Sequence, residues 1–226
     1  YGLAAEQAAP AHLARWVDGA YEDLGTPGSY MSPAALGAGG HLVGAYGSPT
    51  GTGAFVYDGT ALSVLTGLGG TETYALGVSP AGLIVGQATD AGGVWHPVSW
   101  SAADPTTPVI LPTLGGIEAT AVGVSPDGRI VGNSTLADGP MFVDNHTHGM
   151  VIDQGVAYDI NDLLPPGSME VTSLQQATTS GYLLGQSSAG TTVLLVPGAA
   201  PTTPTYDLIE LATSGSEVYG MDLTDE

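Results

Sequence analysis

A phrase that occurs twice in this sequence constrains the fold more than any other feature. Residues 121–132 read Ala-Val-Gly-Val-Ser-Pro-Asp-Gly-Arg-Ile-Val-Gly, and residues 75–86 read Ala-Leu-Gly-Val-Ser-Pro-Ala-Gly-Leu-Ile-Val-Gly. Apolar residues flank a Ser-Pro-x-Gly segment, an order that is typical of two strands joined by a tight turn. The repetition predicts an all-β protein built from copies of one unit.

The second half of this phrase marks five copies of the unit along residues 1–226. Their leading glycines are Gly2, Gly40, Gly82, Gly128 and Gly181, and the copy at Gly2 is degenerate. Each copy offers four strand candidates in about 45 residues, as the blade of a β-propeller does. We therefore predict a single domain, a five-bladed β-propeller with four-stranded blades. A β-sandwich is the alternative, but a sandwich requires no fixed period.

The strand candidates follow in the same order in each copy. First strands are expected at 31–38, 73–79, 119–125, 171–178 and 217–223, and second strands begin at the five glycines. Third strands are expected at 14–19, 54–59, 97–100, 141–145 and 193–197. Fourth strands are expected at 21–25, 62–70, 109–116, 158–165 and 206–211, several of them ending in a Leu-Gly-Gly turn. The Pro- and Thr-rich segments 101–108 and 198–205 are expected to be exposed loops.

The two ends of the chain carry complementary parts of one unit. Residues 217–223 supply a first strand, and residues 2–25 supply the second, third and fourth strands. Pairing of these segments would close a ring and remove two exposed sheet edges. The first strands contain small residues, such as Ala75, Gly77 and Ser79, so we expect them to line a narrow central axis.

The charge balance excludes several partners. The chain has 22 acidic residues and only two bases, Arg15 and Arg129, and its formal net charge is −20. Such a surface repels phosphate backbones and anionic membranes, so neither a nucleic-acid partner nor membrane insertion is expected. No stretch approaches the roughly 20 apolar residues of a membrane span. The sequence contains no cysteine, which excludes disulfides and thiolate chemistry and fits an exported protein.

The repeated phrases resemble a known group of bacterial secreted proteins. Ala-x-Gly-Val-Ser-x-x-Gly-x-Ile-Val-Gly, the Ala-Phe-Val-Tyr-Asp-Gly at 54–59 and the Leu-Gly-Gly segments are similar to the HAF-type extracellular repeat. Asp-Ile-Asn-Asp-Leu-Leu-Pro at 159–165 also resembles a recurring phrase of that family. The resemblance covers essentially the whole chain. It implies export and a repeated β architecture, and it brings no catalytic residues.

His146-Thr147-His148 is the most metal-like feature of the sequence. Alternation along a strand would place both imidazoles on one face, but the segment is expected in a hairpin loop without a third nitrogen ligand. We interpret both as exposed loop histidines. Clustered acids, among them Asp159 and Asp162, are weak candidates for calcium because they lack the spacing of a calcium loop. The expectation is no cofactor, with calcium as the alternative.

An enzyme hypothesis depends on carboxylates near the axis. A glycosidase needs two of them about 5–9.5 Å apart. Asp222 is the plausible acid on an axial strand, whereas Glu72, Glu118, Glu170 and Glu217 recur at the strand entrances. We interpret the repeated glutamates as a solvated edge, with a cation- or ligand-binding ring as the alternative.

Aromatic and amide side chains supply the candidates for ligand binding. Trp95 is expected to be an exposed platform for a sugar ring, whereas Trp16 and Trp100 fall on third strands and are expected in the core. Gln175 and Gln176 interrupt the pattern of small first-strand residues, which would either mark a site or merely loosen one side of the channel.

Two asparagines, Asn133 and Asn145, match the glycosylation acceptor pattern and are expected in loops or at strand ends. Such a position would leave the acceptor amide accessible to the modifying enzyme. The pattern is short enough to match by chance, and modification also depends on the host.

These patterns favour an exported, non-catalytic propeller that acts as a structural, surface-scaffold or self-assembly module, located outside the cell or at its surface. Its expected partner is another protein or a second copy of itself. A carbohydrate-binding, lectin-like propeller is the first alternative. A glycosidase-like enzyme with axial carboxylates is the second.

Overall fold

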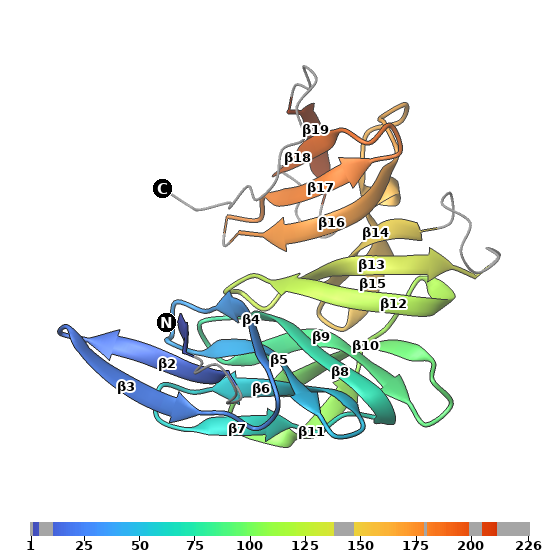
Figure 1. Ribbon diagram of the computed structural model, residues 1–226. Helices are drawn as coiled ribbons and strands as arrows, with labels where there is room; N and C mark the ends of the chain where they lie inside the picture. Colours follow the sequence, from blue (N-terminus) through green and yellow to red (C-terminus); the bar gives the residue numbers. More distant parts are fainter. Residues whose placement is uncertain (1, 5–10, 138–146, 179, 199–204, 212–226) are drawn as a thin grey trace. The chain divides into compact units, whose positions relative to one another are not determined.

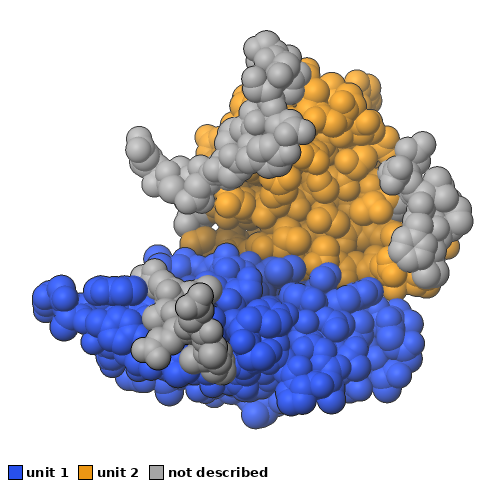
Figure 2. Space-filling view, viewed as in Figure 1, with its two compact units in different colours: residues 1–110 blue, residues 111–226 orange. Residues whose placement is uncertain are grey.

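The computed structural model describes residues 2–4, 11–137, 147–178, 180–198 and 205–211. The regular elements in these ranges are β-strands, apart from one turn of 3-10 helix, η1 (Ile160–Leu163) (Figure 1). The predicted all-β class is therefore confirmed. No helix among the described residues is long and apolar enough to cross a membrane. The chain divides into two compact units, residues 1–110 and residues 111–226 (Figure 2).

Unit 1 contains a three-stranded sheet and an eight-stranded sheet. The three-stranded sheet is formed by β1 (Gly2–Ala4), β2 (His12–Val17) and β3 (Ala20–Gly25). The larger sheet contains two antiparallel meanders. One is β4 (Met31–Leu36), β5 (Leu42–Ser48), β6 (Gly51–Tyr57) and β7 (Leu62–Leu65). The other is β8 (Gly69–Val78), β9 (Leu83–Asp90), β10 (Trp95–Ser101) and β11 (Asp104–Ile110). A parallel pairing of β6 with β8, at Thr52 and Glu72, joins them.

Unit 2 contains two four-stranded antiparallel sheets. The first is β12 (Gly115–Val124), β13 (Ile130–Leu136), β14 (Thr147–Asp153) and β15 (Val156–Asp159). The second is β16 (Val171–Ala177), β17 (Leu183–Ser187), β18 (Thr192–Pro197) and β19 (Tyr206–Glu210). In both sheets, strands that follow one another in the chain are neighbours.

These meanders correspond to the predicted units. Four of them contain four strands in chain order, as the repeat predicts, and β1 to β3 supply three strands of the remaining one. The first strand predicted for that unit, residues 217–223, lies outside the described residues. Closure of a ring through this segment stays a prediction.

The Ser-Pro-x-Gly segment forms the turn between the first and second strands. In the copy at Ser79, the amide of Ser79 donates to the carbonyl of Leu83 at 2.8 Å, and the amide of Gly82 donates to the carbonyl of Ser79 at 3.0 Å. Gly82 has φ +83°, a conformation that strongly favours glycine. The hydroxyl of Ser79 also accepts a hydrogen bond from the amide of Leu83. The repeated sequence therefore encodes a turn to which the serine contributes a side-chain hydrogen bond and the glycine a backbone conformation with positive φ.

A β-bulge recurs in the first strand of all four described meanders. The register shifts between Pro33 and Ala35, between Ala75 and Gly77, between Ala121 and Gly123, and between Leu174 and Gln176. These positions are equivalent in the repeat. A bulge adds one residue to one strand and bends it, so the first strands share a local geometry that the sequence phrase does not reveal by itself.

The last glycine of Ile-Val-Gly is required by a close approach of the first strand. A Cβ at Gly86 would lie 1.9 Å from the carbonyl oxygen of Tyr74, and a Cβ at Gly132 would lie 2.0 Å from that of Thr120. Gly44 and Gly185 meet the carbonyls of Ser32 and Ser173 in the same way, at 2.2 and 2.4 Å. In each copy the residue with this carbonyl directly precedes the bulge. The bulged first strand therefore leaves no room for a side chain at this glycine of the second strand.

Three clusters of buried apolar side chains lie between successive meanders. One joins Leu13 of β2 to Phe55 of β6. Another joins Val56 of β6 to Ile84 of β9, and a third joins Val131 of β13 to Leu195 of β18. Adjacent meanders within each unit therefore pack face to face.

Small first-strand residues serve this packing directly. Ala75 is only 1% exposed and belongs to the cluster between the two meanders of the eight-stranded sheet. Its size permits a close approach of β8 to the neighbouring strands. A central axis lined by such residues remains a prediction.

Several predicted element boundaries are wrong. In the fourth unit the third strand is Thr147–Asp153, which pairs with β13, and the predicted segment 141–145 lies outside the described residues. The predicted fourth strand at 158–165 is replaced by the end of β15 and by η1.

The predicted exposed loop at 101–108 is also wrong in large part, because β11 begins at Asp104 and pairs with β10. β11 is the last strand in the sheet order, and it contains Pro105 and Pro108. An end strand tolerates proline because its outer N–H groups need no partner. Of the corresponding segment 198–205, residues 199–204 lie outside the described residues.

The Leu-Gly-Gly segments do not end the fourth strands as predicted but begin the next first strands. Gly69 opens β8 and Gly115 opens β12, with φ of +95° and +96°. A Cβ at the glycine that follows, Gly70, would lie 2.2 Å from the hydroxyl oxygen of Thr89. The first glycine therefore supplies a backbone conformation, and the second makes room for a threonine.

A glycine-to-alanine substitution tests whether the close approach of the first strand requires glycine in the second. Gly86→Ala should lower the free energy of unfolding by about 3 kcal/mol, because the methyl group overlaps a backbone carbonyl that belongs to a paired strand. Gly92→Ala is the matched control: its Cβ would meet a side-chain oxygen of Asp90 at 3.2 Å, and the site is exposed. The control should change stability by about 0.5 kcal/mol or less. Urea denaturation measures both, and equal effects would contradict the steric explanation.

Asp58, in the β6–β7 hairpin, predicts a pH-dependent contribution to stability. One carboxylate oxygen accepts hydrogen bonds from the hydroxyl of Thr60 and from the amides of Ala61 and Thr60, at 2.6, 2.8 and 2.8 Å. These bonds, the Thr60 hydroxyl first, lower the pKa of Asp58 to about 2. Since the pKa is lower in the folded state, the contribution is present above pH ~4 and is lost as the pH falls through about 2.

Asp58→Ala should therefore lower the free energy of unfolding at pH 7 by less than about 1 kcal/mol, because the site is exposed. The difference from the unsubstituted chain should shrink between pH 4 and pH 2. Denaturant titrations at these three pH values measure it. A difference that stays constant down to pH 2 would contradict the assignment to the ionised carboxylate.

Candidate functional site

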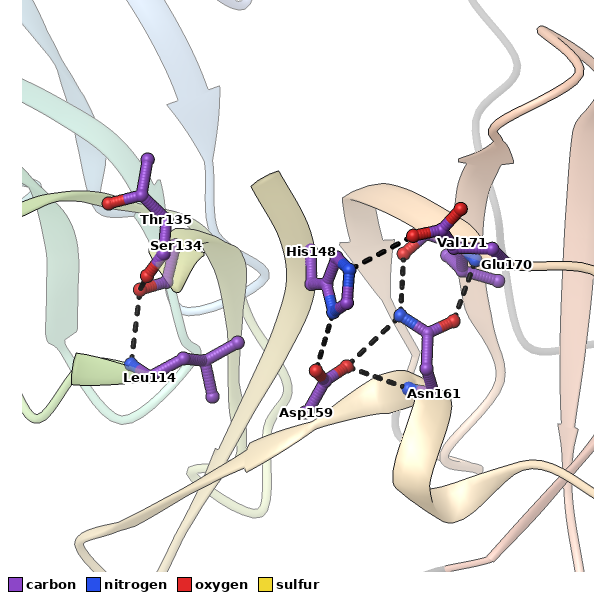
Figure 3. Close-up of polar contacts among 8 residues, drawn as sticks. All are labelled: Leu114, Ser134, Thr135, His148, Asp159, Asn161, Glu170 and Val171. Carbon is purple, nitrogen blue, oxygen red and sulfur yellow. Dashed lines mark hydrogen bonds and ion pairs between the residues drawn. The ribbon is translucent and has the colours of Figure 1, made fainter. Parts of the chain in front are cut away.

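His148 is the centre of a polar cluster in unit 2 that also contains Asp159, Asn161 and Glu170 (Figure 3). Its Nδ1 lies 2.5 Å from a carboxylate oxygen of Asp159, at the end of β15, and its Nε2 lies 3.0 Å from a carboxylate oxygen of Glu170. Glu170 directly precedes β16, so the imidazole joins two different sheets. The side chains of His148 and Asp159 are 14% and 16% exposed, which corrects the expectation of an exposed loop histidine.

Asn161 extends the same cluster to the backbone of β16. Asp159 caps η1 by accepting a hydrogen bond from the Asn161 amide at 2.9 Å, and it accepts another from the Asn161 carboxamide at 3.0 Å. The Asn161 carboxamide in turn accepts from the Val171 amide at 2.7 Å and donates to the Val171 carbonyl at 3.1 Å. The Asp-Ile-Asn segment is therefore a clamp on the first residue of β16.

The polar contacts of this cluster link the two sheets of unit 2 to each other. Both ring nitrogens of His148 face carboxylate oxygens, and the Asn161 carboxamide holds backbone groups at both of its ends. Within the described ranges, no group of three or more His, Cys, Asp or Glu side chains is arranged to hold a metal ion. The structure brings His148 and Asp159 together, a contact that was not predicted from the sequence. It leaves Asp162 exposed on η1.

The remaining acid and histidine candidates have different outcomes. His146, Asn145 and Asp222 lie outside the described residues, as does Glu217. Glu72 and Glu118 lie within the first strands β8 and β12, and only Glu170 stands at a strand entrance. Thr89 and Thr135 fix the backbone of these two glutamates in equivalent ways, because each hydroxyl accepts from the glutamate amide and donates to its carbonyl.

Asn133 lies in the middle of β13, paired on both sides, and not in a loop or at a strand end as predicted. Its carboxamide oxygen accepts a hydrogen bond from the Leu174 amide in β16 at 2.7 Å. This amide is next to Gln175, the bulged residue of β16, which is exposed, while Gln176 is half-buried. The structure thus gives Asn133 a role between sheets, and glycosylation stays an untested prediction.

The three tryptophans lie in very different surroundings. Trp100 is 1% exposed and donates a hydrogen bond to the Thr66 carbonyl at 2.8 Å, as expected for a core residue. Trp16 is 55% exposed and packs edge-on against Tyr21, so its predicted core position is wrong. Trp95, expected to be exposed, is instead half-buried at the start of β10, with its ring centroid 5.9 Å from that of Tyr74 and an inclination of 38° between the rings.

Tyr74 belongs to a group of polar contacts around Thr52. Its hydroxyl donates to Glu72 at 2.9 Å and contacts the Thr52 hydroxyl at 3.3 Å, which the Tyr30 hydroxyl also approaches to 3.3 Å. The hydrogen bond with Thr52 lowers the pKa of Tyr74, but partial burial and the neighbouring Glu72 carboxylate outweigh it and raise that pKa. The phenol therefore stays protonated and a donor at neutral pH.

Both arginines also lie between sheets, which sequence reasoning missed. Arg15 of β2 stacks over the Tyr57 ring at 5.8 Å, donates to the Gly59 carbonyl at 3.3 Å and pairs with Glu22 at 2.6 Å. Arg129 contacts the Tyr206 hydroxyl of β19 at 3.5 Å and lies 3.9 Å from Asp153. The sequence did contain a signal for these positions. A chain with only two basic residues is expected to use each of them for a specific contact.

Comparison with known proteins adds no assignment: no family model matches the chain, and no curated protein matches it either.

Substitution of His148 tests whether the cluster is a cross-link between sheets. His148→Ala should lower the free energy of unfolding by about 2 kcal/mol, because it removes one charge-assisted hydrogen bond to Asp159 in its own sheet and one to Glu170 beside the next sheet. His96→Ala is a matched control, since His96 bonds only Asp90 of its own β9–β10 hairpin, at 3.0 Å, among the polar contacts found for it. The control should cost less than half as much. Denaturation followed by circular dichroism compares them, and the reverse order would contradict the cross-link.

Proposed function

We propose that the chain is a five-bladed β-propeller. The supporting observation is that equivalent positions of successive four-stranded meanders meet one another. A Cβ at Gly37 would lie 3.3 Å from the carbonyl oxygen of Ser79, and one at Gly123 would lie 3.7 Å from the Cα of Gln176. Gly37 and Ser79 hold the same place in the turn, and Gly123 and Gln176 hold the same place after the bulge. Contact between equivalent points is what a rotation about a nearby axis produces.

We infer that this propeller is a non-catalytic scaffold module that acts through association with proteins, including copies of itself. The observation that carries this inference is the use of its most chemically capable groups. His148, Asp159 and Asn161 tie one sheet to the next, and Arg15 and Arg129 do the same at other places. A chain that uses His148 and both of its arginines for contacts between sheets fits a scaffold better than a hydrolase.

An exposed apolar surface at the tip of the β2–β3 hairpin supports the association role. Trp16, Tyr21 and Val17 are 55%, 51% and 47% exposed. The tip turns at Asp18 and Gly19, both with positive φ, which suits a tight two-residue hairpin. Large apolar side chains gathered at one exposed tip are typical of protein interaction sites. The resemblance to HAF-type repeats supports a location outside the cell or at its surface.

Sedimentation velocity over a range of protein concentrations tests the association role. The unsubstituted chain should show a larger sedimentation coefficient as its concentration rises, and Trp16→Ser combined with Tyr21→Ser should abolish this rise because the exposed aromatic pair is removed. Trp95→Ala, a tryptophan change elsewhere in unit 1, is the control and should leave the rise intact. A chain that stays monomeric at every concentration, without any other protein partner recovered, would contradict the association role.

Paired cysteines test closure of the ring independently. Because the chain contains no cysteine, a disulfide can form only between introduced residues. Leu3→Cys combined in turn with cysteine at each position from 217 to 223 should give monomeric disulfides with an alternating pattern, since neighbouring strand residues point to opposite faces. Gel mobility without reductant measures it. Uniformly absent or non-alternating cross-linking would contradict pairing of the chain ends.

A further inference from the structure

We propose that Tyr74 and Trp95, with Tyr30, Glu72 and Thr52, form a binding site for a neutral saccharide. This goes beyond the scaffold role, because it assigns a small-molecule ligand to a surface of unit 1. Four strands or strand ends contribute: Tyr30 precedes β4, Thr52 lies in β6, Glu72 and Tyr74 lie in β8, and Trp95 opens β10.

The two rings provide the apolar surface that a sugar needs. Tyr74 and Trp95 stand on β8 and β10, on either side of β9, with centroids 5.9 Å apart and an inclination of 38°. Both are half-buried, so their positions are fixed while part of each ring reaches solvent. The C–H faces of a pyranose ring pack on such aromatic surfaces, and the polar tips of tyrosine and tryptophan stay available for hydrogen bonds.

Hydroxyl and carboxylate groups converge beside these rings. The hydroxyls of Tyr30 and Tyr74 both approach the Thr52 hydroxyl to 3.3 Å, and Tyr74 donates to Glu72 at 2.9 Å. One hydrogen bond leaves a carboxylate with further acceptor capacity. A few polar groups placed against an aromatic surface are the usual composition of a saccharide or small-ligand site. Tyr30 is 45% exposed, which keeps the group open to solvent.

The backbone around Glu72 is held in place before any ligand arrives. The Thr89 hydroxyl accepts from the Glu72 amide at 3.1 Å and donates to the Glu72 carbonyl at 3.3 Å. Thr89 is 5% exposed and pairs with Trp95 across β9 and β10. The same buried threonine therefore lies next to both the acid and the tryptophan, and a rigid support of this kind reduces the entropy lost on binding.

Charge restricts the saccharide to a neutral one. The chain carries a net charge of −20, and the Tyr74 hydroxyl is hydrogen-bonded to a carboxylate, that of Glu72. Uronic acids and sulfated sugars would be repelled by both. A neutral oligosaccharide can donate its hydroxyl protons to Glu72 and Thr52 without an electrostatic penalty.

Fluorescence titration with a panel of neutral hexasaccharides (cellohexaose, xylohexaose, mannohexaose and chitohexaose) tests the site. At least one should change the tryptophan emission in a saturable way. Trp95→Ala and Tyr74→Ala should weaken that binding about tenfold or more, measured by calorimetry, since each removes a stacking surface. Glu72→Gln should weaken it less and shows whether the carboxylate contributes. Trp16→Ala is the matched control and should retain full affinity, because Trp16 is exposed in the same unit but belongs to the β2–β3 hairpin.

Circular dichroism verifies that each variant is folded before its affinity is interpreted, and the Glu72→Gln and Tyr74→Phe variants keep the shape of the site if the alanine variants unfold. Binding of no panel member, preferential binding of polygalacturonate, or equal affinity of the Trp95→Ala and unsubstituted chains would each overturn the proposal. None of these outcomes affects self-association, which depends on Trp16 and Tyr21.

Discussion

The close approach of the first strand to the second is the constraint on which the other features depend. A bulge in the first strand brings a backbone carbonyl to within about 2 Å of where a Cβ would stand at Gly86 or Gly132. The bulge bends the strand, and the missing side chain lets the two backbones meet. Once the strands are so placed, alternate residues such as Ala75 and Val131 face the neighbouring sheet and form its core. The last glycine of Ile-Val-Gly recurs in the copies because this geometry requires it.

Polar residues then fix the relation between neighbouring sheets. Asn133 accepts the amide of Leu174 at the bulge, His148 reaches Glu170, and Asn161 holds both backbone groups of Val171. Face-to-face apolar packing alone is tolerant of sliding, because dispersion contacts have little directionality. Directional hydrogen bonds to the first strand remove that freedom. Rigidity between the two sheets of unit 2 thus comes from polar side chains, among them a histidine and two asparagines.

The sequence predicted the repeat unit well because turns and bulges are encoded locally. Ser79, Pro80 and Gly82 specify their turn without help from the rest of the chain. Where the signal was composition alone, prediction was wrong: the Pro- and Thr-rich residues 104–110 form a strand because pairing with β10 overrides the loop preference. The histidine at 148 was placed in a loop because the third strand of its unit was assigned too early. Its contacts with Asp159 and Glu170 depend on register and on packing of two sheets, and neither can be read from spacing.

The composition of β11 has a consequence for solubility. This strand ends the sheet order of unit 1, and its last two residues, Val109 and Ile110, are more than half exposed. Exposed apolar side chains on an end strand are a typical starting point for amyloid-like growth, in which a second molecule adds its own strand. Pro105 and Pro108 have no amide proton to offer such a strand. The same prolines that favoured the loop prediction therefore make this edge a poor template for the strand of a second molecule.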